Sequence, residues 1–79
     1  YPNPFNPNTK IKFDLPRESD VNITIFDISG KMVQELLSMS LPAGTYEKSF
    51  NAAYLSSGIY YYKIETGSFN DTKKMILIK

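Results

Sequence analysis

The 79-residue sequence contains no cysteine and no histidine. Without cysteine, disulfide bonds cannot cross-link the fold and no thiolate can bind a metal ion. Without histidine, the chain lacks the usual general base of catalysis and the commonest metal ligand. Both absences argue against an enzyme or a metalloprotein.

Two further features are scarce, namely excess charge of one sign and long apolar runs. The formal net charge is +1, so no strong field attracts nucleic acid or anionic lipid. No apolar run approaches the roughly 20 residues that cross a bilayer. The sequence begins at Tyr1 without an initiator Met or a visible signal peptide, and we expect a C-terminal piece of a longer polypeptide. Its length predicts one small domain over residues 1–79, with little room for a deep cleft.

Aromatic residues are abundant, at 14 %, and all are Tyr or Phe, which favours strands. Short runs with alternating polarity are separated by turns rich in Gly, Pro, Ser, Asn and Asp. This spacing predicts an all-β, Ig-like or fibronectin-III-like sandwich of six to seven antiparallel strands. The six runs are Thr9–Leu15, Val21–Ile28, Met32–Leu37, Thr45–Phe50, Leu55–Thr66 and Thr72–Lys79.

Two segments are less regular. Residues 1–8 contain three prolines, which exclude an interior strand and predict an extended lead-in that could add a seventh strand. Its Tyr1 and Phe5 are available to pack against the sheet. Ser38–Leu41 is expected to be irregular, or a short edge strand.

The closing part of the chain carries the clearest local signal. Leu55-x-x-Gly58-x-Tyr60 has the spacing of a tyrosine corner, in which the hydroxyl returns to upstream backbone. If Tyr60 points inward, period two places Tyr62 and Ile64 with it and directs Ile59, Tyr61, Lys63 and Glu65 outward.

The last strand is harder to orient, because both of its faces are apolar. Lys73 and Lys79 share a face with Met75, so we expect Ile76 and Ile78 to enter the core instead. Gly30 is expected to adopt positive φ in a reversal, and Gly44 to close a turn. The residues predicted to hold the fold are Leu55, Gly58, Tyr60, Tyr62, Ile64, Gly44 and Gly30.

Carboxylates are the main candidates for chemistry. Asp14 and Asp27 lie at strand ends, but nothing in their spacing brings them together for acid–base catalysis. Asn70-Asp71 and the Asp27 turn offer oxygen ligands for calcium, yet no D-x-D-x-D-G loop exists. Roles in turns are favoured, and we predict no catalytic residue, metal or cofactor.

Tyr60-Tyr61-Tyr62 could form an aromatic platform for a sugar or single-stranded nucleic acid. Two of these tyrosines are assigned to the core, so Tyr61 beside Ile59 forms only a modest interface patch. Lys73-Lys74 is too short for a nucleic-acid stripe and is typical of charges that guard a β-prone strand.

Five blocks in order resemble one family. The blocks are Tyr1–Pro7 (YPNPFNP), Val21–Lys31 (VNITIFDISGK), Pro42–Tyr46 (PAGTY), Leu55–Tyr60 (LSSGIY) and Lys73–Lys79 (KKMILIK). Together they are similar to the type A C-terminal sorting domains of the type IX (Por) secretion system of Bacteroidetes and related bacteria. The resemblance covers essentially the whole chain.

The resemblance implies an Ig-like signal that directs a secreted cargo through the periplasm and the outer-membrane translocon. It also implies that a sortase-like peptidase removes the domain, after which cargo is released or attached at the cell surface. The expected partners are the translocon, the peptidase and a cargo domain ahead of Tyr1, with a homodimer through an exposed strand edge left open. The alternative is a structural or carbohydrate-binding accessory module retained on a secreted enzyme.

The resemblance concentrates the signal in the last strands, and the outward row on the first of them is the expected contact face. The residues predicted to contact the translocon are Gly58, Ile59, Tyr61, Lys63, Lys73, Lys74 and Lys79.

Overall fold

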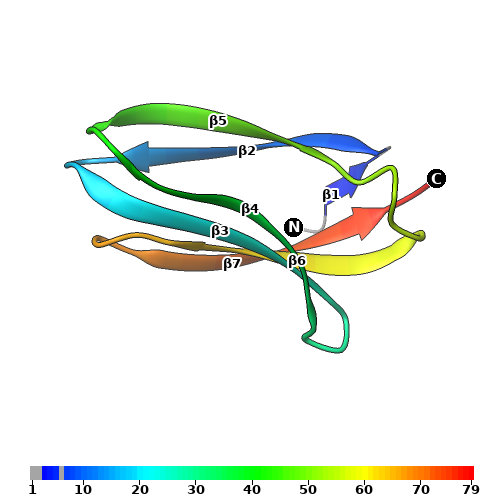
Figure 1. Ribbon diagram of the computed structural model, residues 1–79. Coiled ribbons are helices and arrows are strands. Elements are labelled where there is room, and N and C mark those ends of the chain that lie inside the picture. Colours follow the sequence, from blue (N-terminus) through cyan, green and yellow to red (C-terminus); the bar gives the residue numbers. More distant parts are fainter. Residues whose placement is uncertain (1–2, 6) are drawn as a thin grey trace.

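The computed structural model describes residues 3–5 and 7–79, with the side chains described from residue 7 onward. The chain forms seven strands in two facing sheets (Figure 1). The strands are β1 (Asn3–Phe5), β2 (Asn8–Leu15), β3 (Ser19–Asp27), β4 (Met32–Leu41), β5 (Gly44–Asn51), β6 (Gly58–Glu65) and β7 (Asn70–Leu77). The larger sheet has the order β1-β7-β6-β3-β4 and the smaller one pairs β2 with β5. The predicted all-β, Ig-like sandwich is confirmed.

No helix occurs in the described part of the chain, and none there could therefore cross a membrane. Six of the strands pair antiparallel, as predicted, whereas β1 runs parallel to β7 with Phe5 opposite Leu77. The lead-in therefore adds a seventh strand, and its Pro4 is tolerated because β1 lies at a sheet edge. The predicted packing of the Tyr1 and Phe5 side chains lies outside the described residues.

The expectation of irregular backbone at Ser38–Leu41 is corrected. These residues continue β4, which is ten residues long, and Leu41 pairs with Ser19 at the start of β3. Two register shifts interrupt the pairing of β3 with β4, but both lie at residues 23–26 of β3. Backbone pairing with β3 therefore extends the strand through a segment whose composition gave no clear signal.

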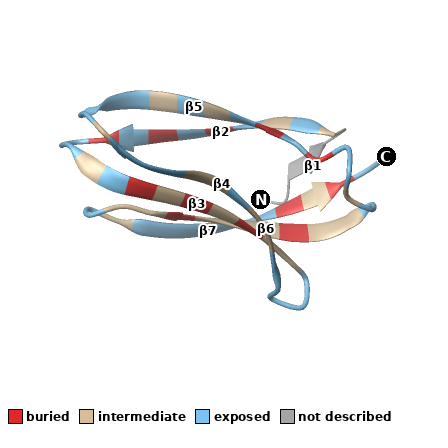
Figure 2. Cartoon of the chain, viewed as in Figure 1, coloured by how far each residue is buried: buried red, intermediate tan, exposed pale blue. Residues whose placement is uncertain are grey.

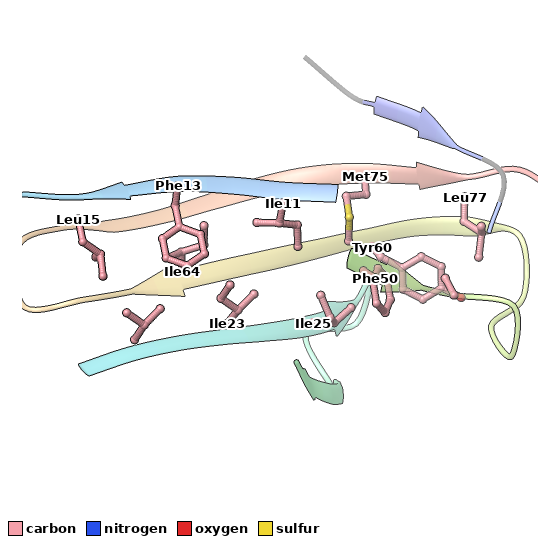
Figure 3. Packing of buried hydrophobic residues seen from close by; sticks show 12 residues of the cluster. Ile11, Phe13, Leu15, Ile23, Ile25, Phe50, Tyr60, Ile64, Met75 and Leu77 are labelled. Carbon is pink, nitrogen blue, oxygen red and sulfur yellow. The ribbon is translucent and has the colours of Figure 1, made fainter. Parts of the chain in front are cut away.

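The core forms where the two sheets face each other (Figures 2 and 3). In β2, apolar residues alternate with exposed Lys10, Lys12 and Asp14, so one face of the strand is buried and the other is solvated. The interior strand β3 contributes three residues with no exposed surface, Val21, Ile23 and Ile25. The core residues are Ile11, Phe13, Leu15, Val21, Ile23, Ile25, Phe50, Ala52, Tyr60, Ile64, Met75 and Leu77.

The predicted orientation of the last strand is wrong. Met75 and Leu77 are only 2 % and 1 % exposed, whereas Ile78 is 50 % exposed. The reason is the register of β6 against β7, in which Met75 lies opposite Tyr60. Directly opposed residues share a face, so an inward Tyr60 carries Met75 inward with it. The prediction relied on Lys73 and Lys79, which alternate with Met75. These two lysines did not identify the exposed face, because Lys73 precedes the buried pair of Met75 and Leu77 and Lys79 follows it.

We therefore predict that truncations of two neighbouring residues, the last of β7 and the one after it, differ in their effect on stability. Leu77→Ala empties a buried site and is expected to lower the free energy of unfolding by about 2–5 kcal/mol. Ile78→Ala removes a half-exposed side chain beyond the strand end and should change it by about 0.5 kcal/mol or less. Urea unfolding of both variants measures the difference, and a larger loss for Ile78→Ala would contradict the assigned face.

Candidate recognition surface

The crossover from β5 to β6 contains the predicted tyrosine corner. The Tyr60 hydroxyl donates a hydrogen bond to the Ser56 carbonyl oxygen at 2.8 Å, and the side chain is 8 % exposed. Ala52 at the start of the crossover is fully buried and Leu55 packs against the core. The prediction is confirmed, and the corner fixes the direction in which β6 enters the larger sheet.

A second corner of the same kind was not predicted. The Tyr46 hydroxyl donates to the Pro42 carbonyl oxygen at 2.7 Å, again four residues upstream. The Tyr46 ring stacks on Phe13 with ring centroids 5.5 Å apart. Gly44-x-Tyr46 repeats the spacing of Gly58-x-Tyr60, and this repetition was the signal available in the sequence.

The turn between β3 and β4 is built around Asp27. One carboxylate oxygen accepts hydrogen bonds from the Ser29 amide (2.9 Å), the Ser29 hydroxyl (2.6 Å) and the Lys31 amide (3.0 Å). Gly30 has φ of 88°, a left-handed value that glycine adopts without steric cost, as predicted. The Ser29 hydroxyl bond is the main cause that lowers the pKa of Asp27 below 3.8, followed by the Lys31 amide. The carboxylate thus has a turn-forming role.

The loop between β6 and β7 is organised by Thr66. Its hydroxyl oxygen accepts hydrogen bonds from the Ser68 and Phe69 amides, both at 3.0 Å, and the Thr66 amide donates to the Phe69 carbonyl oxygen at 2.9 Å. The Gly67 amide donates to the Ser19 hydroxyl at 2.7 Å, which ties the loop to β3. These bonds hold the two closing strands at one end of the sandwich.

The face of the larger sheet that points away from β2 and β5 is here named the outer face. On β6 it presents Ile59, Tyr61 and Lys63, each half-buried by its neighbours, as the period-two pattern predicted. Since β6 lies between β7 and β3, side chains from three adjacent strands meet on this face.

The register shows which side chains meet. Tyr61 lies between Phe26 of β3 and Lys74 of β7, and Ile59 lies opposite Ile76. One end of the outer face is thus apolar and its centre is aromatic.

Toward the other end the outer face becomes polar. Lys63 lies between Thr24 and Thr72, and its ammonium is 3.7 Å from the Glu65 carboxylate. Lys74 has no ion-pair partner among residues 7–79. The face therefore combines an apolar and aromatic strip with cationic groups.

The seven residues predicted to contact the translocon do not share one surface. Ile59, Tyr61, Lys63 and Lys74 lie on the outer face. Lys73 has the opposite orientation, opposite Tyr62, with its ammonium 3.9 Å from the Asp71 carboxylate.

The other two predicted contact residues lie at the end of the sandwich. Gly58 is the first residue of β6. Lys79 is bound to the crossover, since its amide donates to the Ser57 hydroxyl at 3.1 Å and its ammonium to the Ala53 carbonyl oxygen at 2.6 Å. Lys79 therefore ties the segment after β7 to the crossover rather than presenting a free charge.

Tyr62, one of the residues predicted to hold the fold, lines a hollow. Tyr62 is half-buried, and burial, with a smaller effect of Asp71, raises the pKa of its hydroxyl above 10.0. The hollow has a volume of about 190 Å³ and lies between β2 and the closing strands. It is smaller than the roughly 300–1,000 Å³ of typical small-molecule sites. A larger hollow of about 590 Å³ lies over β2 and β5 and is lined by Asn8, Thr9, Lys10, Lys12 and Ser49. No group of three or more His, Cys, Asp or Glu side chains suited to a metal ion occurs in the described residues.

Three comparisons with known proteins complete the description. The model of the family described as secretion system C-terminal sorting domain matches residues 1–79. Neither the search of curated proteins nor the search of solved structures returned a match.

The Asp27 turn gives a prediction on pH. Because the folded pKa of Asp27 lies below its unfolded value, this carboxylate contributes stability that is complete above about pH 3.8 and is lost as pH falls through the folded pKa. Ser29→Ala should raise the pKa toward 3.8, while Ser29→Thr, which keeps the hydroxyl, should not. Carbon-13 NMR titration of the carboxyl group measures both. An unchanged pKa in Ser29→Ala would contradict the role of the hydroxyl.

Proposed function

The chain belongs to the family of secretion system C-terminal sorting domains, and we propose that the export machinery reads it through the outer face of its larger sheet. A domain of this family is a sorting signal of the type IX secretion system, which exports proteins through the periplasm to the cell surface or the medium. The proposal concerns the residues that carry the signal within the domain, residues 1–79.

The observation that carries the proposal is the position of Tyr61. This side chain is half-buried between Phe26 and Lys74 at the centre of the outer face, so little of its rotamer freedom remains to be lost on binding. Tyrosine is also enriched among the residues that dominate protein–protein binding energy. Ile59 and Ile76 extend the same strip with apolar surface.

The charges on the outer face define the chemistry of the partner. Lys74 has no ion-pair partner among residues 7–79, and the ammonium of Lys63 lies near the carboxylate of Glu65. A partner that places carboxylates opposite these two lysines and apolar side chains opposite Ile59 and Tyr61 would be complementary. Such complementarity contributes mainly to specificity and association rate.

The remaining partners follow from the family. We propose that the outer-membrane translocon binds this face, that a sortase-like peptidase then removes the domain, and that the cargo precedes Tyr1. The domain itself acts as a ligand and performs no catalytic step. Its lack of histidine and cysteine supports that role. Copies of the chain also associate through an open strand edge, a contact separate from the export machinery.

Charge-reversal variants test whether the outer face, and not another part of the surface, carries the signal. Lys63→Glu combined with Lys74→Glu should lower the amount of secreted cargo, by about tenfold if the two charges together contribute about 1.4 kcal/mol to recognition. The matched control is Lys12→Glu with Arg17→Glu, which makes the same change in net charge at two exposed side chains away from the outer face and leaves Lys10 to pair with Glu47. Immunoblots of medium and periplasm measure the secreted fraction of a fused cargo.

Both double variants should unfold at similar temperatures, so that loss of folding does not imitate loss of recognition. Equal secretion by the two variants would contradict the outer face as the recognition surface. Intact-mass analysis of the same secreted cargo tests the peptidase step. Cargo that lacks residues 1–79 supports removal, and cargo that retains them contradicts it.

A further inference from the structure

The sandwich leaves several strand edges without a neighbour among the described residues. An open edge exposes backbone amides and carbonyl groups that can pair with another strand, and charged side chains along the edge discourage such pairing. Three open edges carry at least two charges each. They are β2 (Lys10, Lys12, Asp14), β5 (Glu47, Lys48) and the start of β7 (Asp71, Lys73, Lys74).

The edge of β4 differs from these three, and it is longer than the three-residue edge strand β1, which contains Pro4. It is the longest strand and contains a single charged residue, Glu35, after which no charge occurs before Glu47. Met39 is 52 % exposed, although it lies opposite Val21, which is fully buried. Apolar surface therefore extends from the core to an open edge that no charge protects.

The second half of β4 is also symmetric in sequence. Residues 37–41 read Leu-Ser-Met-Ser-Leu in both directions. They pair with residues 19–23 of β3 without a register shift, so the segment is a regular strand. Leu37, Met39 and Leu41 share its core-side face, and Ser38 and Ser40 share the other face.

We propose that a second copy of this chain pairs antiparallel with residues 37–41 of β4, about a two-fold axis at Met39. An isologous contact requires a surface that is complementary to itself, and a palindromic strand meets this requirement. Leu37 then lies opposite the second copy's Leu41, Met39 opposite Met39, and Ser38 opposite Ser40. The proposal goes beyond the sorting role and does not depend on it.

Two physical effects favour this pairing over the other edges. The open backbone groups of residues 37–41 gain hydrogen bonds, and the apolar side chains on the core-side face cover one another. In this register Glu35 lies opposite the second copy's Ala43, so no like charges meet. An equivalent contact along the start of β7 would bring Lys73 and Lys74 of the two copies together, which is unfavourable.

The proposed contact between the two copies ends at Pro42. Pro42 has no amide hydrogen and cannot continue the ladder, which limits the pairing to about five residues. A contact of this length is expected to be weak and to depend on protein concentration. The contact lies at the β4 edge of the larger sheet, and β3 separates β4 from β6 and β7. Tyr61 of β6 and Lys74 of β7 therefore remain accessible in the dimer.

The absence of cysteine makes disulfide trapping specific. In Met39→Cys, the two thiols lie on directly opposed residues, whose Cα atoms are about 4.5–5.5 Å apart in antiparallel sheets, within the range that a disulfide spans. The matched control is Met32→Cys, on the same strand and 57 % exposed. The proposed register separates the two copies of residue 32 by roughly 45 Å, at about 3.3 Å per residue.

Mild oxidation should convert Met39→Cys to a species of twice the monomer mass that reductant reverses, while Met32→Cys remains monomeric. Equal cross-linking of the two variants would overturn the register. Sedimentation equilibrium gives a second measurement. The unmodified chain and Met32→Lys should dimerise at high concentration, and Met39→Lys should remain monomeric while folded by circular dichroism. A monomer at every concentration, or a dimer that persists in Met39→Lys, would overturn the proposal.

Discussion

The structure depends on the register of β6 against β7, in which Tyr60 lies opposite Met75. This pairing determines which side chains close the core and which lie on the outer face. With Tyr60 inward, Met75 and Leu77 complete the buried cluster seen in Figure 3, and Tyr61 and Lys74 necessarily face outward. A shift by one residue would exchange the two sets, because the side-chain period of a strand is two. The core and the outer face, which we propose as the recognition surface, therefore depend on the same pairing.

The two ends of this strand pair are fixed by different bonds. At one end, the Tyr60 hydroxyl holds the Ser56 carbonyl oxygen and Lys79 is bound to the same crossover. At the other end, Thr66 organises the loop and Gly67 connects it to Ser19 of β3. A domain of this size has a small core, so such local bonds are a substantial part of what keeps its closing strands in register. Side chains held in place by such bonds lose little conformational entropy when they are bound, which favours the proposed role in recognition.

Sequence reasoning succeeded where the signal is local. The spacing of Gly58 and Tyr60 gave the tyrosine corner, and alternation in Thr9–Leu15 gave the buried face of β2. Prediction from the sequence failed where the structure depends on residues far along the chain. Both faces of β7 are apolar, so the sequence of β7 alone did not show which face is buried. The continuation of β4 through Ser38–Leu41 and the parallel pairing of β1 likewise follow from neighbouring strands. Four of the seven predicted contact residues share the outer face, whereas Lys73 and Lys79 were assigned without knowledge of register.

The most direct test of the account is whether the side chains of Tyr60 and Met75, which belong to directly opposed residues, lie close together. Isotope-edited NMR on the folded chain reports it as a nuclear Overhauser effect between two assigned side chains. We expect a strong effect from the Tyr60 ring to the Met75 methyl group and none to Ile76. A strong effect to Ile76, with none to Met75, would show that β6 and β7 pair in another register. That result would contradict both the assigned core and the proposed recognition surface.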